Sequence, residues 1–414
     1  MSLFPSFFLG GFECATHRRR DGRRLDLVAS TRHDRFATAD YARLRDAGIL
    51  AARDGVRWHL IEPRPGVYDF ASAVPMLRAA REAGVLVVWD LLHFGWPDHV
   101  DVWAADFADR FARFAGAFAR VHRDEAGGLL FVAPVNEPSF VSFAGGQEGF
   151  FNPFATGRGD DLKARLVRAA VAAVEAVWAV GPARVVHTDP IINIQADPTR
   201  PQDRVAAEVY RQSQFAVWDM LAGRARPELG GHPKYLDILG VNYYPQNQWF
   251  HNPFGKESVL LVPSHPHHLP LRYMLREVHE RYGRPLFVAE TGIEDDARPD
   301  WLRYVAGEVA AAVGLGVPVE GVCLYPVVNH PGWDDDRHCH NGLWDYADDD
   351  GRREIYGPLA DELRRQQRTF DRIFSGDARP SAGGAADVQT LDTAARHMGD
   401  LTDHARDTGA GPGG

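Results

Sequence analysis

Short hydrophobic runs, rich in β-branched and aromatic residues, recur along the chain, and stretches with helical periodicity separate them. In stretches such as 107–122 and 164–180, Ala, Leu, Val and Phe return at the i, i+3, i+4 spacing of an amphipathic helix. Strands that alternate with helices are typical of parallel βαβ units. The predicted strands span residues 7–14, 50–58, 85–92, 129–135, 184–188, 236–242, 286–289 and 321–325.

Eight strands, each followed by a helix, predict an α/β fold of the (β/α)8 barrel type in a single domain over residues 1–374. An open doubly wound sheet also alternates strands and helices, but its first strand usually runs into a GxGxxG phosphate turn. The residues Gly10 to Glu13 do not have that pattern. The barrel is therefore the preferred fold, and its active site is expected at the carboxyl ends of the strands.

Two long loops and the C-terminal segment depart from the regular alternation. Residues 144–161 and 245–270 follow the fourth and sixth strands and are rich in aromatic residues, so both are expected to cover the barrel mouth. From 375 to 414 the composition changes to Ala, Gly, Asp, Thr and Pro. This segment is predicted to be a disordered tail with one weak helix near 391–406.

Polar and charged side chains stand at the predicted strand ends. Asn136 and Glu137 end the apolar fourth strand, and Glu290 ends the seventh. Two carboxylates that face each other across a barrel mouth can cleave a glycosidic bond, because one protonates the leaving oxygen while the other meets the developing oxocarbenium ion. The other strand ends and the loop after the eighth strand add a polar and aromatic set: Glu13, Arg53, His93, Asp189, Asn242, Tyr244 and Trp333.

This set resembles the clan A glycoside hydrolases, and most of all family 1, the β-glucosidase family. The resemblance rests on Val135-Asn136-Glu137-Pro138, on Glu290 in Leu286 to Gly292, on Arg53 through Ile61-Glu62-Pro63, on Asn242-Tyr243-Tyr244 and on Tyr325 to Trp333. It implies a retaining β-glycosidase with Glu137 as acid/base and Glu290 as nucleophile. It also implies that Arg53 and Tyr244 hydrogen-bond the nucleophile. A retaining mechanism would place the two carboxyl groups about 5–5.5 Å apart.

A sugar also needs hydrogen-bonding groups for its hydroxyls and a flat apolar surface for its ring. The hydroxyl-binding candidates are Glu13, His93, Asn136 and Asn242, and the platform candidates are Trp333 and Tyr325. The predicted substrate is a small glycoside or oligosaccharide bound by its chain end. The mechanism requires no metal or organic cofactor.

Several positions depart from the family pattern. Tyr325 stands where the family usually has Trp, Gly332 where it has Glu, Glu13 where it has Gln, and Phe94 where it has Trp. The alternatives left open are a catalytically weak or inactive carbohydrate-binding barrel and a transglycosidase, which shares the covalent intermediate. An acidic Glu13 raises the hypothesis of an amino sugar or another hydroxyl pattern. A Schiff-base aldolase is disfavoured, because Lys163, Lys234 and Lys256 lie in predicted helices or loops.

The composition and net charge limit the classes of molecule that the protein is expected to bind. Hydrophobic residues make up 45% and charged residues 25% of the 414 residues, which is ordinary for a globular protein. The net charge of -10 argues against binding to nucleic acid or anionic lipid, and the sequence has no long apolar run that would cross a membrane. Three scattered cysteines fit a cytoplasmic protein without a disulfide framework. The sequence leaves the oligomeric state open.

Overall fold

A closed barrel of eight parallel strands forms the centre of the computed structural model, which describes residues 2–253, 258–377 and 389–395. The ring order is β1-β10-β9-β7-β5-β4-β3-β2, so strands that follow one another along the chain lie side by side. All eight predicted strands and the (β/α)8 prediction are confirmed. The barrel strands are β1 (Phe8–Gly11), β2 (Ala51–Gly55), β3 (Leu86–Leu92), β4 (Leu130–Val135), β5 (Ala183–Pro190), β7 (Ile238–Asn242), β9 (Leu286–Thr291) and β10 (Val319–Leu324).

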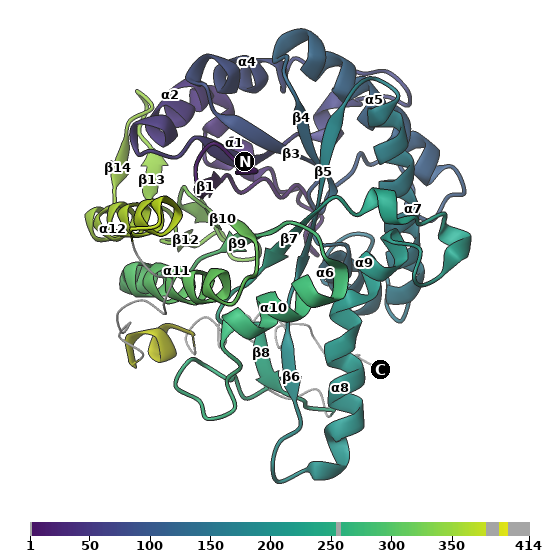
Figure 1. Ribbon diagram of the computed structural model, residues 1–414. Coiled ribbons are helices and arrows are strands. Elements are labelled where there is room, and N and C mark those ends of the chain that lie inside the picture. Colours follow the sequence, from purple (N-terminus) through teal and green to yellow (C-terminus); the bar gives the residue numbers. More distant parts are fainter. Residues whose placement is uncertain (1, 254–257, 378–388, 396–414) are drawn as a thin grey trace.

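Helices surround the barrel in the order of the chain (Figure 1). The two helices predicted in detail are confirmed as α5 (Phe107–Glu125) and α7 (Gly159–Trp178), which pack against each other. The other longer helices are α2 (His33–Asp46), α4 (Val74–Ala83), α8 (Arg204–Gln212), α10 (Leu271–Tyr282), α11 (Arg298–Gly314) and α12 (Gly357–Ser375). The short ones are α1 (Leu27–Ser30), α3 (Trp58–Ile61), α6 (Pro138–Val141) and α9 (Ala216–Leu221). No helix within the described ranges has the length and apolarity needed to span a membrane.

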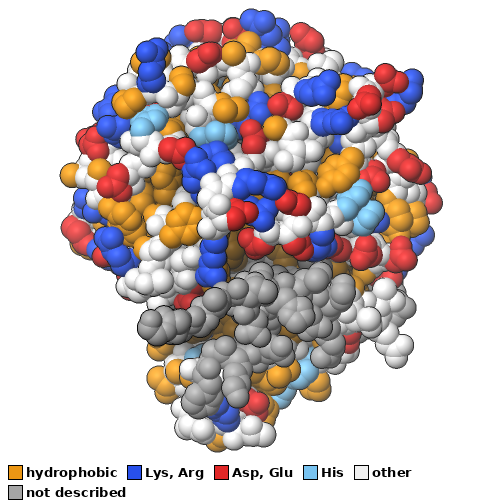
Figure 2. Space-filling view, turned by 180° about the vertical axis from the view of Figure 1, so that it is seen from behind, with side chains coloured by type: hydrophobic (Ala, Val, Ile, Leu, Met, Phe, Trp, Pro, Cys, Tyr) orange, Lys and Arg blue, Asp and Glu red, His pale blue; other side chains and the backbone are white. Residues whose placement is uncertain are grey.

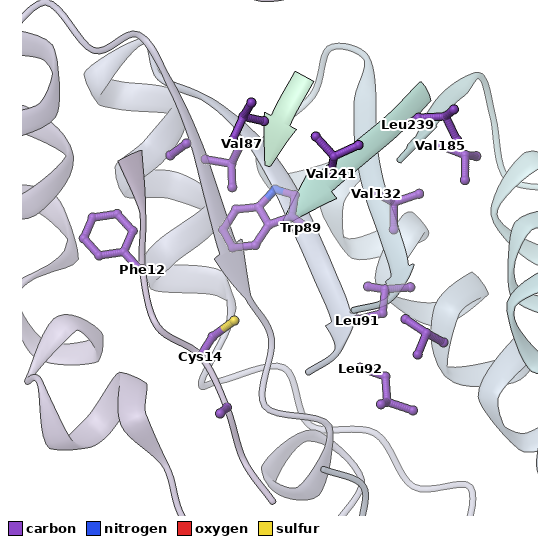
Figure 3. Packing of buried hydrophobic residues seen from close by; sticks show 14 of the residues in the cluster. Phe12, Cys14, Val87, Trp89, Leu91, Leu92, Val132, Val185, Leu239 and Val241 are labelled. Atoms are coloured by element: carbon purple, nitrogen blue, oxygen red, sulfur yellow. The ribbon is translucent and has the colours of Figure 1, made fainter. Parts of the chain in front are cut away.

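Two hydrophobic clusters hold the barrel, one on each side of its wall. On β3, Val88 belongs to the interior cluster, while Val87, Trp89 and Leu91 belong to the layer between barrel and helices. Figure 3 shows these three outward side chains together with residues of the same cluster on β4, β5 and β7, among them Val132, Val185, Leu239 and Val241. Because both faces of a barrel strand are covered, the strands are apolar on both sides. A charged residue inside such a strand must therefore find its partner within the barrel.

The loop predicted over 245–270 contains structure that the sequence analysis did not expect. β8 (Gln248–Phe250) pairs in parallel with β6 (Asn193–Gln195), which follows β5. These strands and α8 project beyond the ring of helices in Figure 1. The remaining small pairs are β11 (His330–Pro331) with β12 (His338–Cys339) and β13 (Trp344–Ala347) with β14 (Arg353–Ile355).

Part of the predicted tail is described. Residues 389–395 are helical, Leu391 is fully buried, and Ser264 donates to the Asp392 carboxylate. This segment falls at the position of the expected weak helix. The rest of the predicted tail, 378–388 and 396–414, lies outside the described residues.

Charged side chains of both signs alternate on the surface, as the face in Figure 2 shows. Many of them form ion pairs at the rim of the barrel mouth. Arg18 and Arg24 pair with Asp98, and Arg19 and Arg23 pair with Asp336. These salt bridges tie the first loop to its neighbours.

Candidate active site

The carboxylate of Glu290, near the end of β9, is held by two donors. Arg53 Nη1 donates to Oε1 at 2.8 Å, and the Tyr244 hydroxyl donates to Oε2 at 2.9 Å. Burial and the negative charges of Glu290 and Glu137 raise the pKa of Tyr244 far above its usual value, so the phenol keeps its proton and remains a donor. The predicted contacts of Arg53 and Tyr244 with Glu290 are therefore present in the structure.

Arg53 is completely buried inside the barrel, and each of its terminal nitrogens serves two acceptors. Nη1 also donates to the Ala289 carbonyl, while Nη2 donates to Asp90 Oδ2 at 2.6 Å and to Asn136 Oδ1 at 2.9 Å. Although burial opposes ionisation of Asp90, the Arg53 charge and a hydrogen bond with His93 lower its pKa. A buried guanidinium needs such compensation, and here it is fixed between the carboxylates of β3 and β9.

Glu137 lies in a different environment. It follows β4 in the left-handed region, with φ of 45°, and caps the start of α6. Asn242 Nδ2 donates to its Oε1 at 2.8 Å. Burial and then the negative charge of Glu290 raise its pKa well above the usual value, with a further contribution from Asp189. These shifts favour the protonated form of Glu137, which is the form a general acid uses.

Asn136 and His93 form the floor of the site beside Glu137. Asn136 Oδ1 accepts from Arg53 and from the Thr188 hydroxyl, so its amide nitrogen faces His93 Nε2 at 3.2 Å. His93 Nε2 is then an acceptor, and the ring proton lies on Nδ1, which is 3.0 Å from Asp90 Oδ2. These hydrogen bonds fix the orientations of the Asn136 amide, the His93 ring and the Asp90 carboxylate.

The two platform candidates differ in what they can offer a ligand. Tyr325 is only 2% exposed, and its ring lies 5.2 Å from the Arg53 guanidinium and parallel to the His93 ring. It supports Arg53 and has little free ring surface, which is a correction to the expectation of a sugar platform there. Trp333 is partly exposed and packs against His17, Phe94 and Phe140.

The loop at 144–161 reaches this aromatic group. Phe151 is buried against Phe94 and His17, and the side chain of Asn152 bonds to the backbone of Arg18 and Phe94. The loop is therefore attached to the ends of the first and third strands. Its expected position over the mouth agrees with these contacts.

Other charged candidates are used in ion pairs elsewhere. Arg57 pairs with Asp26 and Asp34. In the Asp334 to His340 stretch, Arg337 pairs with Glu294 and His338 with Asp345. These ion pairs hold the loop against its neighbours.

The side chains of Cys14, Asp90 and His93 lie inside the site, and each has one potential metal-ligand atom close to the other two. Asp90 already binds Arg53, and burial with nearby carboxylates raises the pKa of the Cys14 thiol far above its usual value. Since a metal would require the thiolate, this group fits a hydrogen-bonded cluster better than a metal centre.

Two residues of the network were not among the predicted site residues. Asp90 lies within an apolar strand, and that position alone was a signal that the sequence analysis did not use. Asp189 was noted only as a strand-end residue. It accepts from the backbone N–H and the hydroxyl of Ser139, in the first turn after Glu137.

The chain was compared with known proteins. No family model matches it. The β-galactosidase of Sulfolobus acidocaldarius is 26% identical over 308 residues, which are 62% of this chain and 61% of that protein. The chain thus spans about three-fifths of the length of this curated relative.

Solved structures match over most of the chain. A crystal structure of the AHE enzyme of Alicyclobacillus herbarius has a TM-score of 0.72 at 19% identity and covers 89% of this chain and 99% of that one. A family 1 β-glucosidase of Thermotoga maritima has a TM-score of 0.70 at 15% identity, with 88% and 98% covered. At these identities the structures establish the shared fold. The fold and the sequence match confirm the predicted resemblance: this chain is similar to the glycoside hydrolases of clan A and, within that clan, to family 1.

Proposed function

We propose that the protein is a retaining β-glycosidase that hydrolyses small glycosides or oligosaccharides. The observation that carries the proposal is the contrast between two carboxyl groups at one barrel mouth. Glu290 receives hydrogen bonds from Arg53 and Tyr244, whereas burial and the Glu290 charge raise the pKa of Glu137 and favour its protonated form. Opposite protonation states are what a nucleophile and a general acid require.

In the first step, Glu290 attacks the anomeric carbon while Glu137 gives its proton to the departing oxygen. The new ester neutralises Glu290, so the charge that raises the pKa of Glu137 is lost and Glu137 becomes a base. It then takes a proton from water, and the water oxygen displaces Glu290 from the sugar. Tyr244 and Arg53 receive the released carboxylate.

The supporting groups fit a sugar. Within the described residues, Asn242 Oδ1 and Glu13 Oε2 accept no hydrogen bond and are available to sugar hydroxyls, and Trp333 offers a partly exposed indole. We keep Asn136 and His93 as proposed hydroxyl-binding residues. The relatives carry names of the same activity class, a β-galactosidase and a β-glucosidase. With all three cysteines free and buried, a cytoplasmic location stays our prediction.

The test is release of 4-nitrophenol from a panel of aryl β-glycosides by wild type, Glu137→Ala and Glu290→Ala. The surface variant Glu175→Ala, which breaks an exposed pair with Lys234, is the control for expression and folding. Both site variants should lose at least 100-fold in kcat, with the control unaffected. Azide should restore turnover of Glu290→Ala with an α-glycosyl azide as product, and NMR should show a β-configured first product from wild type.

Either of two results would overturn the proposal. An α-configured first product from wild type would mean inversion. Binding of a sugar without turnover of any glycoside would make the protein a carbohydrate-binding barrel.

A further inference from the structure

Glu13 is a buried carboxylate at the barrel mouth with one oxygen unoccupied by the protein. Glu13 is 6% exposed, and its Oε1 accepts a hydrogen bond from the backbone N–H of Ala15 at 2.9 Å. Within the described part of the chain, no hydrogen bond reaches Oε2. A buried carboxylate oxygen without a hydrogen-bond donor is costly, so a partner for this oxygen is expected from outside the protein.

The nearest cationic candidates do not supply that partner. The terminal N–H groups of Arg53 are engaged by Ala289, Glu290, Asp90 and Asn136. His93 Nε2 lies 3.7 Å from Glu13 Oε1, too far for a hydrogen bond, and it accepts from Asn136. At this distance no hydrogen bond joins His93 to Glu13.

The charges of the site favour a cation. Although burial opposes a charge on His93, Asp90, Glu13 and Glu290 together raise its pKa. The charge of Glu13 also contributes to the raised pKa of Tyr244, after burial and the charges of Glu290 and Glu137. The charge of Glu13 thus reaches the same group of side chains as the catalytic pair, and carboxylates outnumber the cations there.

The barrel order places Glu13 far from the acid. Glu13 follows β1, which is three strands from β4 with Glu137 and two from β9 with Glu290. If the anomeric carbon lies between Glu137 and Glu290, as the proposed function requires, Glu13 faces the opposite end of the sugar ring. That end carries the substituents at C3 and C4, whereas C2 is adjacent to the reacting centre.

We propose that Glu13 selects a glycone with a protonated amino group at C3 or C4, which donates to its free oxygen. This inference rests on the proposed function for the direction of the ring. A charge-assisted hydrogen bond in a buried site is about twice as strong as a neutral one, and the ammonium would also neutralise the buried carboxylate. A hydroxyl at that position would leave the charge uncompensated.

The experiment is calorimetric binding of methyl β-glycosides, in both gluco and galacto configuration, at a pH where the amine is protonated. The ligands carry an amino group at C3, C4 or C2, or are the neutral parents. Wild type should bind the C3 or the C4 amine at least tenfold more tightly than its parent and than the C2 amine. Glu13→Gln, which keeps the shape but removes the charge, should abolish that preference.

Equal binding of amine and parent by wild type would overturn the inference, and so would a preference that survives in Glu13→Gln. If the variant does not fold, N-acetylation of the preferred amine decides, because the neutral amide should lose the tenfold gain in wild type. Binding is measured without turnover, so an amine preference in a protein that cleaves no aryl glycoside would contradict the proposed function alone.

Discussion

Ser139 donates twice to Asp189: its hydroxyl lies 2.6 Å from Oδ2 and its backbone N–H lies 3.0 Å from Oδ1. Asp189 ends β5, so a neighbouring strand holds the first turn of α6, the helix that Glu137 caps with a left-handed backbone. Glu137 N–H also donates to the Thr188 carbonyl. The acid is therefore positioned by β5 as much as by its own strand.

The first prediction follows from the charge of Asp189. Burial raises the pKa of Asp189 to about 7, and its charge contributes to the raised pKa of Glu137. Asp189→Asn keeps an acceptor for Ser139 but removes the charge, so the pKa of Glu137 should fall. The alkaline limb of kcat/KM, which reports loss of the Glu137 proton, should move to lower pH.

The control for this pH profile is Asp237→Asn, which breaks an ion pair with Arg184 at the other end of the barrel wall. Its alkaline limb should match that of wild type. An unshifted limb in Asp189→Asn would show that Asp189 does not tune the acid.

The second prediction concerns Tyr244. Tyr244→Phe removes the hydroxyl that donates to Glu290 Oε2 and leaves the ring. A hydrogen bond to a charged group contributes about 1.5–3 kcal/mol, so kcat should fall by about 10- to 100-fold while the thermal unfolding temperature changes little. Tyr243→Phe is a neighbouring control, because the Tyr243 hydroxyl bonds to Gln248 away from the carboxylates. A Tyr244→Phe enzyme with wild-type kcat would remove Tyr244 from the site.

The sequence was sufficient to predict the barrel, because each strand and helix has a distinct local period. It also pointed to Glu137, Glu290, Arg53 and Tyr244, which the structure brings together, since polar residues at the ends of apolar strands are conspicuous. Asp90 was missed although a charged residue inside an apolar strand is a signal, because a strand that is apolar on both faces has no alternation to show which face Asp90 lies on. Only register shows that Asp90 faces inward beside Arg53, as the pairing of β2 with β3 allows.

Features that depend on distant pairings were harder to anticipate. β8 has three residues, too few for a period, and its partner β6 lies more than 50 residues earlier. Tyr325 was assigned a free ring face, but packing against Arg53 and His93 covers it. Such contacts arise from closure of the barrel, which joins β1 to β10.

The third prediction is a pH dependence of stability. His33 is buried between two carboxylates, with Nδ1 2.9 Å from Asp40 Oδ2 and Nε2 2.9 Å from Asp54 Oδ2. Although burial opposes the charge, Asp54 and Asp40 raise the pKa of His33 to about 9. Because the folded pKa exceeds the unfolded value, the stabilisation is complete below about pH 6.5 and is lost as pH rises to about 9.

Denaturant titrations across this range should show wild type losing about 3 kcal/mol of unfolding free energy from this group, at 1.36 kcal/mol per pKa unit. His33→Gln should lack that loss, so the difference between the two proteins should shrink as pH rises. His122→Gln is the control, because burial lowers the pKa of His122 to about 4 and it does not titrate in this window. Parallel wild-type and His33→Gln curves would show that His33 is neutral throughout.

The fourth prediction concerns the helical segment 389–395. Leu391 is fully buried in the main core cluster, and Asp392 accepts from Ser264 in the long loop after β8. Replacing a buried Leu with Ala removes about 2–5 kcal/mol of stabilisation. This loss exceeds the net stabilisation that the one remaining hydrogen-bonded contact, between Ser264 and Asp392, provides. Leu391→Ala should therefore release the segment and speed amide hydrogen exchange over residues 258–269.

Thr393→Ala, on the exposed side of the same segment, should leave exchange at the wild-type rate. If both variants exchange at that rate, the segment does not hold the loop, and the loop's order must come from the pairing of Gln248 with Leu261 and Leu269.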